Sequence, residues 1–410
     1  MALKIPRIEP RLADRVLAQV AHDDVLGLLR ELVQIPSVNP PGDVRPVIDI
    51  CGRKLESKGF EIQLASVQPE KPNLIARLIR GDGPTLLYNA HADVVPTGEA
   101  SAWTHPPFGA DVEGGRVYGR GTADDKGSIV AQVIGAIALA RSGVPLHGTL
   151  IVNTVADEEI GGDFGTRFIV ERGDVMPDFV VVGEATENRI AIGERGTVGT
   201  RVTVHGRAAH AALPWEGVNA IEAMAAVIDM LQNEHWPALV RRTHQYLPPS
   251  SATITMIEGG VKSNVVPDRC SIFIDSRIIP GETPDQIRSE ISEIAAKALS
   301  SFPGTRLTVE PAGWEARAAS LSSPDSPVVQ AMVAANGYLG LRTDLTGFSM
   351  TTDARFFIEK GIPTVIYGPG DPQILHKPDE WIGVDAVVEA ARAYALTGLA
   401  MLGAPDQGNG

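Results

Sequence analysis

The sequence has 410 residues, of which 44% are hydrophobic and 21% are charged. A chain of this length exceeds one typical hydrophobic core, so two or three domains are expected. The formal net charge is −14 and no block of Lys and Arg occurs, which argues against nucleic acid and anionic membranes as partners. Two cysteines supply neither a disulfide framework nor a thiolate zinc site. Without a signal-peptide pattern or an apolar run of about 18 residues, the chain is expected in the cytoplasm.

The first half of the chain alternates between helical and strand-like apolar patterns. Helical spacing of apolar residues covers residues 12–34, 43–58 and 127–140. Strand-like apolar runs cover residues 74–78, 85–89, 149–154 and 179–182. This alternation predicts an α/β fold in which helices cover both faces of a mostly parallel sheet.

The pattern changes near Gly193. Strands are predicted over residues 197–204, 252–257, 270–278 and 306–310, and helices over 219–231 and 284–299. The order β-α-β-β-α-β is typical of a ferredoxin-like sandwich. Residues 314–401 return to α/β character, with a strand at 363–367 and a closing helix at 384–402. We therefore predict one domain of residues 1–193 and 314–410, into which a small ferredoxin-like domain, residues 194–313, is inserted.

A histidine and an aspartate follow the strand predicted over residues 85–89. His91 lies just beyond that strand and Asp93 two residues further on. In an α/β sheet, ligands gather beyond the carboxyl ends of the strands. Asp93 could accept a hydrogen bond from the second imidazole nitrogen and so orient His91. A polar strand end with an unrelated His and Asp is the alternative.

Two aspartates, Asp124 and Asp125, stand between a glycine-rich turn and the predicted helix 127–140. Glycines allow a tight turn there and a close approach of the backbone to other groups. Either carboxylate could cap the N-terminus of the helix. Either could instead be a metal ligand that faces the strand ends, and the spacing leaves this open.

Further acidic residues follow two other predicted strands. Glu158 and Glu159 end a β-rich run, Glu184 follows the strand 179–182, and His376 stands in a late loop. Adjacent residues point in different directions, so one glutamate could bind a metal while the other stays free as a base. A solvated acidic cluster and an ordinary loop histidine are the alternatives. Taken together, two imidazoles and four or five carboxylates suffice for two divalent metals and a base, which indicates metal-assisted hydrolysis.

A set of short motifs resembles the M20 family of metallopeptidases and amidohydrolases, which includes acetylornithine deacetylase, succinyl-diaminopimelate desuccinylase, aminoacylase and glutamate carboxypeptidase. The resemblance covers roughly residues 20–400. The matching stretches are HADVVP, W-x-x-x-PF, GRGTADDKG, ADEEIGG, GEA, GRAAHAALP, KSNVVPD, DSRIIPGE, TTDARF and LHKPDE. It implies a zinc-peptidase-like fold with a mixed, mostly parallel sheet in the larger, catalytic domain. It also implies that the inserted domain acts as a lid and dimerisation domain.

The resemblance implies a site for two divalent metals, with zinc expected and cobalt or manganese as alternatives. Asp124 would bridge the two metals. The remaining ligands would be His91 and Glu184 on one metal, and Glu159 and His376 on the other. Glu158 would be the general base, and Asp93 would orient His91.

The resemblance also assigns residues of the inserted domain. His210 would reach toward the oxyanion, often from the partner subunit, which implies a homodimer formed through that domain. The residues implied to bind substrate are Asn264, Arg277 and Thr351. Arginine suits bidentate binding of a carboxylate. An ion pair of Arg277 with Asp275 or Asp268 is the alternative.

Two departures from the family pattern bear on the substrate. Phe348-Ser349-Met350 stands where the deacetylase and desuccinylase branches usually carry a glycine-rich run, which predicts a pocket for a bulkier or more apolar acyl group. Asp125 stands where these deacylases often have Met, and the dipeptidase branch also contains Asp-Asp-Lys-Gly. We expect a dimetal amidohydrolase that cleaves the amide bond of an N-acyl amino acid or a related carboxylate-bearing amide. The alternatives are a metallo-exopeptidase or dipeptidase, and a non-catalytic metal-binding protein.

Overall fold

The computed structural model describes residues 8–313 and 315–404. The chain divides into two compact units. The first unit takes in the described residues of Met1–Gly193, Ser322–Thr346 and Thr352–Gly410. The second takes in those of Glu194–Leu321 and Gly347–Thr351. The boundaries and the role of an inserted domain stay a prediction.

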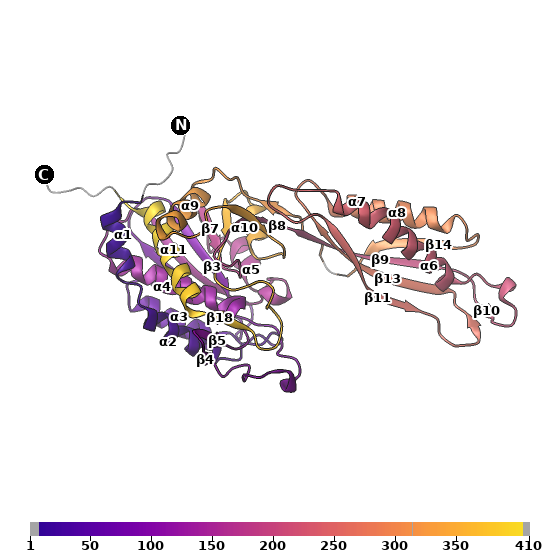
Figure 1. Ribbon diagram of the computed structural model, residues 1–410, viewed down its shortest axis with the longest axis horizontal. Helices are drawn as coiled ribbons and strands as arrows, with labels where there is room; N and C mark the ends of the chain where they lie inside the picture. Colours follow the sequence, from indigo (N-terminus) through magenta and orange to yellow (C-terminus); the bar gives the residue numbers. More distant parts are fainter. Residues whose placement is uncertain (1–7, 314, 405–410) are drawn as a thin grey trace. The chain divides into compact units, whose positions relative to one another are not determined.

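A mixed β-sheet forms the centre of the first unit (Figure 1). Its strands lie in the order β1-β2-β6-β3-β7-β17-β8. The pairs β6–β3, β3–β7 and β7–β17 are parallel, whereas the outer pairs are antiparallel. The strands are β1 (Glu61–Ala65), β2 (Asn73–Ile79), β3 (Thr85–His91), β6 (Thr149–Val155), β7 (Phe179–Val182), β8 (Ile190–Glu194) and β17 (Thr364–Ile366). The predicted α/β class with a mixed, mostly parallel central sheet is confirmed.

Helices cover the central strands of this sheet. In Figure 1, α4 (Gly127–Arg141) and α11 (Val384–Leu402) lie on one side of β3 and β7, and α5 (Thr166–Arg172) and α10 (Ala354–Ile358) lie on the other. Leu86 and Leu87 of β3 are fully buried, as expected of a strand covered on both faces. Helices α4 and α11 pack closely at Gly135, where a Cβ would lie 2.7 Å from the carbonyl oxygen of Ala391.

The N-terminal region folds as two helices, α1 (Pro10–Leu17) and α2 (His22–Val33), so the single helix predicted over residues 12–34 is wrong. Ala21 is extended, and Asp23 and Asp24 then lie in the first turn of α2. Carboxylates interact favourably with a helix dipole at that end, which explains why a new helix begins there. Further elements of this unit are α3 (Arg45–Glu56), α9 (Pro327–Leu339), β4 (Asp111–Glu113), β5 (Arg116–Tyr118) and β18 (Trp381–Gly383).

The second unit contains a four-stranded antiparallel sheet in the order β11-β13-β9-β14. Its main elements are, in chain order, β9 (Gly196–His205), α6 (Ala220–Met230), β11 (Ser251–Gly259), β13 (Arg269–Ile278), α8 (Pro284–Leu299) and β14 (Arg306–Pro311). Val202, Ile274 and Ile291 are fully buried in a core between sheet and helices. Strands β10 (Ala209–His210) and β12 (Val265–Val266), far apart in the chain, pair antiparallel in a separate two-stranded sheet, and α7 (Trp236–Val240) follows α6. Strands β15 (Ser320–Leu321) and β16 (Leu345–Phe348) lie where the chain passes between the units.

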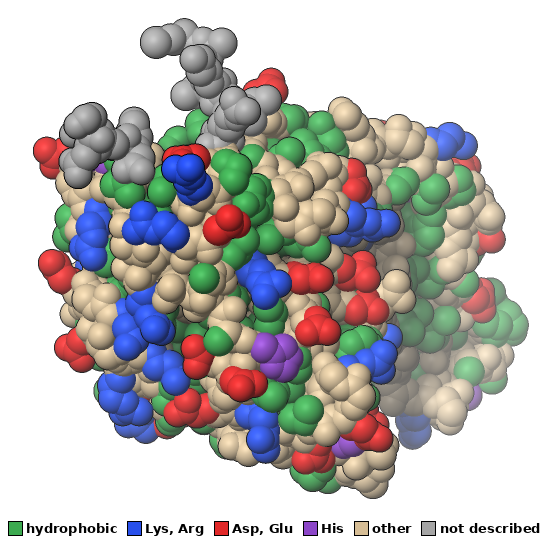
Figure 2. Space-filling view, turned by 60° about the vertical axis from the view of Figure 1, so that its left-hand side comes forward, with side chains coloured by type: hydrophobic (Ala, Val, Ile, Leu, Met, Phe, Trp, Pro, Cys, Tyr) green, Lys and Arg blue, Asp and Glu red, His purple; other side chains and the backbone are tan. Residues whose placement is uncertain are grey.

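The surface carries mixed charge. On the described part of the face shown in Figure 2, acidic and basic side chains are interspersed rather than separated. Among the described residues, no helix combines the length and the apolar character needed to cross a membrane.

Candidate metal centre

The parallel strands place the candidate side chains at one edge of the first unit's sheet. Strand β3 ends at His91 and pairs with β6 on one side and with β7 on the other. Glu158 and Glu159 come soon after β6, and Glu184 comes soon after β7. Because the three strands run in the same direction, the side chains beyond their carboxyl ends meet at the same rim.

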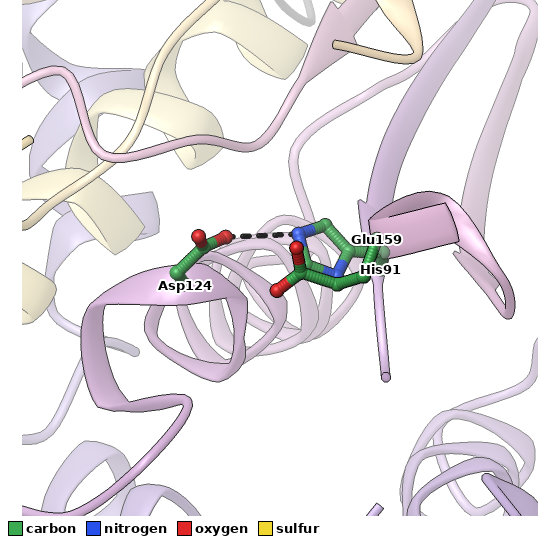
Figure 3. A group of neighbouring side chains, drawn as sticks. All are labelled: His91, Asp124 and Glu159. Carbon is green, nitrogen blue, oxygen red and sulfur yellow. Dashed lines mark hydrogen bonds and ion pairs between the residues drawn. The ribbon is translucent and has the colours of Figure 1, made fainter. Parts of the chain in front are cut away.

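His91, Asp124 and Glu159 form a cluster of potential metal ligands (Figure 3). One ligand atom from each of them lies within 4.8 Å of the others. His91 Nε2 is 3.0 Å from Asp124 Oδ1, and both residues are buried. Of the two adjacent aspartates, Asp124 faces the cluster, whereas Asp125 Oδ2 accepts a hydrogen bond from the backbone N–H of His91 at 3.3 Å.

Asp124 lies between two imidazoles. Its Oδ1 faces His91 Nε2, and its Oδ2 is 3.1 Å from His376 Nε2. The same His376 nitrogen is 3.3 Å from Glu159 Oε2. His376 belongs to a loop and has a positive φ of 63°, a backbone conformation that few residues with a side chain adopt. Asp124 therefore has one histidine at each carboxylate oxygen, and His376 also reaches Glu159.

The electrostatics of the cluster fit divalent cations. Burial, together with the charge of Asp124, raises the pKa of Glu159 to about 7. Burial also raises the pKa of Glu184, with added repulsion from Asp124. Glu159 Oε1 is buried without a hydrogen-bond partner among the described residues. Crowded buried carboxylates favour a neighbouring cation, and imidazole nitrogen with carboxylate oxygen is a donor set that zinc accepts.

Asp93 has a different set of contacts from the one expected. His91 Nδ1 lies 2.9 Å from the backbone carbonyl oxygen of Asp93 and 3.7 Å from its carboxylate Oδ1. The carboxylate instead accepts hydrogen bonds from the backbone N–H groups of Glu158, at 3.2 Å, and Glu159, at 3.3 Å. The backbone of Asp93 therefore orients His91, while its side chain holds the turn that carries the two glutamates.

Arg120 and Glu380 also contact the site, and the sequence motifs assigned no role to either. Glu380 Oε1 accepts hydrogen bonds from the backbone N–H groups of Ala123, at 2.9 Å, and Asp124, at 3.3 Å. Arg120 Nη1 donates to Glu380 Oε2 and to the carbonyl oxygen of Lys377. Both residues belong to motifs that carry the family resemblance, GRGTADDKG and LHKPDE. Their place in these motifs could have pointed to a role in the site.

The four residues assigned to oxyanion and substrate all belong to the second unit. His210 is exposed in the two-stranded sheet of β10 and β12. The N–H of Ala211, which follows His210, donates to the carbonyl oxygen of Asn264 at 2.9 Å. Arg277 Nε donates to Asp275 Oδ1 at 2.8 Å, so the alternative ion pair is present in this structure. Thr351 Oγ1 donates to the carbonyl oxygen of Arg195 at 2.9 Å. Their roles in binding substrate stay predictions.

Over residues 87–399 the sequence matches the family model described as Peptidase family M20/M25/M40. The succinyl-diaminopimelate desuccinylase of Dechloromonas aromatica (strain RCB) is 31% identical over 384 residues, which cover 91% of this chain and 97% of that protein. The desuccinylase of Gluconacetobacter diazotrophicus (strain ATCC 49037 / DSM 5601 / CCUG 37298 / CIP 103539 / LMG 7603 / PAl5) is 32% identical over 389 residues and covers 92% of this chain and 96% of its own.

Solved structures with a similar fold include two M20 proteins. An M20 family metallo-carboxypeptidase from Sulfolobus solfataricus superposes with a TM-score of 0.71 at 21% identity, covering 92% of this chain and 98% of that chain. A dinuclear metal-binding peptidase of the M20 family from Bacillus subtilis superposes with a TM-score of 0.70 at 19% identity, covering 93% of this chain and 98% of that chain. At these identities the likeness shows the fold alone.

Proposed function

The chain belongs to peptidase family M20/M25/M40, and from this we propose that it is a dimetal amidohydrolase that cleaves the amide bond of an N-acyl amino acid or a related carboxylate-bearing amide. One observation carries the proposal: the carboxylate of Asp124 has His91 at one oxygen and His376 at the other. A carboxylate shared in this way suits a pair of metals in one hydrolytic site.

Five side chains of the first unit would hold the metals. They are His91, Asp124, Glu159, Glu184 and His376. Imidazole and carboxylate donors suit zinc, and cobalt or manganese could take the same ligands. When bound, the metals supply Lewis acidity, which makes water easier to deprotonate and an amide carbonyl easier to attack.

Glu158 would act as the general base. Burial raises the pKa of its carboxyl group well above the usual value, which makes the carboxylate a stronger base than an exposed one. It would take a proton from the attacking water and later hand it to the leaving amine. The hydrogen bond from its backbone N–H to Asp93 keeps the turn that carries it in place.

The second unit carries four side chains that we propose act on the substrate. His210 would donate a hydrogen bond to the developing oxyanion, and Asn264, Arg277 and Thr351 would hold the substrate carboxylate and its neighbours. In this proposal the unit is an inserted lid and dimerisation domain, the protein is a homodimer, and the enzyme works in the cytoplasm. Phe348 and Met350 would favour a bulkier or more apolar acyl group than acetyl.

A metallo-exopeptidase or dipeptidase is the second candidate. Solved structures of similar fold include a carboxypeptidase and the human carnosine dipeptidase 1, at 21% and 16% identity. The deacylase is favoured because two relatives above 30% identity that cover most of the chain are succinyl-diaminopimelate desuccinylases.

Hydrolysis of a mixed panel of N-acyl amino acids and dipeptides by the zinc-loaded protein, beside its Glu158→Ala variant, tests the proposal. Turnover of acyl amino acids by the wild type and not by the variant is the expected result. Turnover of dipeptides alone would assign the protein to the peptidase branch. Turnover of neither, with metal bound, would refute the deacylase.

A further inference from the structure

A buried polar network lies behind the proposed base. It consists of Asn39, Lys71, Asp93 and Asp157, which are between 0% and 5% exposed. These residues come from four separate segments of the first unit, and only Asp93 has been given a role above. Burying two carboxylates and an ammonium group is costly unless each polar atom has a partner, so their arrangement depends on specific contacts.

The side chain of Asn39 connects the other three members. Its Nδ2 donates to Asp93 Oδ2 at 2.8 Å and to Asp157 Oδ1 at 3.3 Å. Its Oδ1 accepts from Lys71 Nζ at 3.4 Å, and Lys71 also forms an ion pair with Asp157. An ammonium group only donates and ionised carboxylates only accept, so one orientation of the Asn39 amide satisfies all three partners.

The network ends at the turn that carries the two glutamates. The Asp93 carboxylate accepts hydrogen bonds from the backbone N–H groups of Glu158 and Glu159. Asp157, directly before them, has a positive φ of 74°, and its Oδ2 accepts a hydrogen bond from the N–H of Phe164 at 3.1 Å. The turn is therefore held from both sides by carboxylates that share the Asn39 amide.

The backbone around Asn39 is also tied to the segment after His91. The N–H of Asn39 donates to the carbonyl oxygen of Val94 at 2.9 Å, and the N–H of Val94 donates to Ser37 at 3.0 Å. At Gly42, which has a φ of 80°, a Cβ would lie 2.8 Å from Asn39 Oδ1. The amide is thus fixed by its backbone as well as by its hydrogen bonds.

We propose that Asn39 is a positioning residue for the hydrolytic site: its amide holds the Asp93 carboxylate, and through it the places of Glu158 and Glu159, while Lys71 sets the orientation of the amide. This inference rests on the proposed dimetal function. Asn39 acts on the reaction only through Asp93 and Asp157. Partners of this kind behind metal ligands typically change metal affinity or activity by about 10–100-fold when they are altered.

The test uses the full-length protein and Asn39→Asp, which keeps the shape of the side chain but replaces its donor by an acceptor beside two carboxylates. Metal-free protein is titrated with Co²⁺ and followed by visible absorption, which reports the metal without any substrate. We expect Co²⁺ binding about 10–100-fold weaker than in the wild type. In the zinc-loaded variant we expect a fall of similar size in kcat with a smaller change in KM.

Asn336→Asp is the matched control. Asn336 is fully buried in the same unit, donates to the carbonyl oxygens of Asn188 and Arg342, and accepts a hydrogen bond from Tyr367. Like Asn39→Asp, this substitution replaces a buried side-chain amide by a carboxyl group, but at a position outside the network. It should leave Co²⁺ affinity unchanged even where it lowers the melting temperature. An equal loss of affinity in both variants would mean general destabilisation and would overturn the inference.

Lys71 provides a second pair of variants in case Asn39→Asp does not fold. Lys71→Met removes the donor that orients the amide and should weaken Co²⁺ binding, whereas Lys71→Arg keeps a donor and a charge and should restore most of it. Equal affinities in these two variants would refute the role of Lys71. A wild type that binds fewer than two Co²⁺ would overturn the proposed function and this inference together. Two Co²⁺ bound with equal affinity by wild type and Asn39→Asp would overturn the inference alone.

Discussion

Arg120 and Glu380 form a buried ion pair in which the guanidinium Nη1 lies 2.5 Å from the carboxylate Oε2, and 1% or less of either residue is exposed. Glu380 also accepts hydrogen bonds from the backbone at Asp124, and Arg120 donates to the carbonyl oxygen of Lys377, next to His376. The pair therefore joins the turn that carries one proposed metal ligand to the loop that carries another.

Arg120→Met should lower the free energy of unfolding by about 3–5 kcal/mol, because it leaves a buried carboxylate without its partner. Urea denaturation of the metal-free protein measures this change. Arg172→Met is the control, since Arg172 is half-exposed in its ion pair with Asp174. This substitution should lower the free energy of unfolding by no more than about 1 kcal/mol. Equal losses of unfolding free energy in the two variants would show that the buried ion pair stabilises the protein no more than the exposed one.

Glu158→Gln should lower kcat by about 10²–10⁴-fold, because glutamine has a similar shape but cannot accept the proton. Bound metal should remain at the wild-type level, since Glu158 is not a proposed ligand. Steady-state kinetics and elemental analysis of the same sample measure both quantities. Glu171→Gln, at an exposed position of α5, should behave as the wild type. A loss of kcat below tenfold would remove Glu158 from the role of base.

Metal binding should release protons. In the metal-free site, hydrogen bonds to Asp124 and Glu159 raise the pKa of His376 to about 10, and burial raises the pKa of Glu159 to about 7. At pH 7 the imidazole therefore carries a proton that a metal must displace, and the carboxyl group is partly protonated. Affinity for Zn²⁺ should consequently rise with pH between about 6 and 8. Calorimetry in two buffers of different ionisation enthalpy counts the protons, and pH-independent affinity without release would contradict the proposed ligands.

Ile274→Ala in β13 should destabilise the protein by about 2–5 kcal/mol, because the side chain is fully buried in the core of the second unit. Ile257→Ala in the neighbouring strand β11 is the control, since Ile257 is 60% exposed. This substitution should change the free energy of unfolding by no more than about 0.5 kcal/mol. Thermal or urea unfolding of both variants compares the two positions. Similar losses would mean that the core of this unit is loosely packed.

The strands with strong apolar runs were predictable. The run 85–89 corresponds to β3 and the run 179–182 to β7, because a strand buried on both faces has to be apolar along most of its length. The short strands β4, β5 and β18 were missed. Their pairing depends on contacts such as Trp381 with Tyr118, far apart in the chain, and no local pattern encodes those contacts.

The kinds of side chain in the candidate site could also be read from the sequence, since imidazoles and carboxylates followed strands that should share one rim. Local pattern could not decide between Asp124 and Asp125, because both stand in the same turn. Nor could it show that the backbone of Asp93 contacts His91 while its carboxylate holds Glu158. These choices depend on distances of a few ångströms between separate segments.

The sequence by itself determined the fold class, the family and the chemical inventory of the site, because these follow from periodicity and from short motifs, each made of neighbouring residues in the chain. The tertiary structure decided which atoms face one another. Asn39 and Asp157 are 118 residues apart, and Arg120 and Glu380 are 260 apart, yet each pair is joined by a buried hydrogen bond. Such partners are selected by the packing of the whole first unit, since a buried polar atom must find its acceptor wherever the fold brings one within reach.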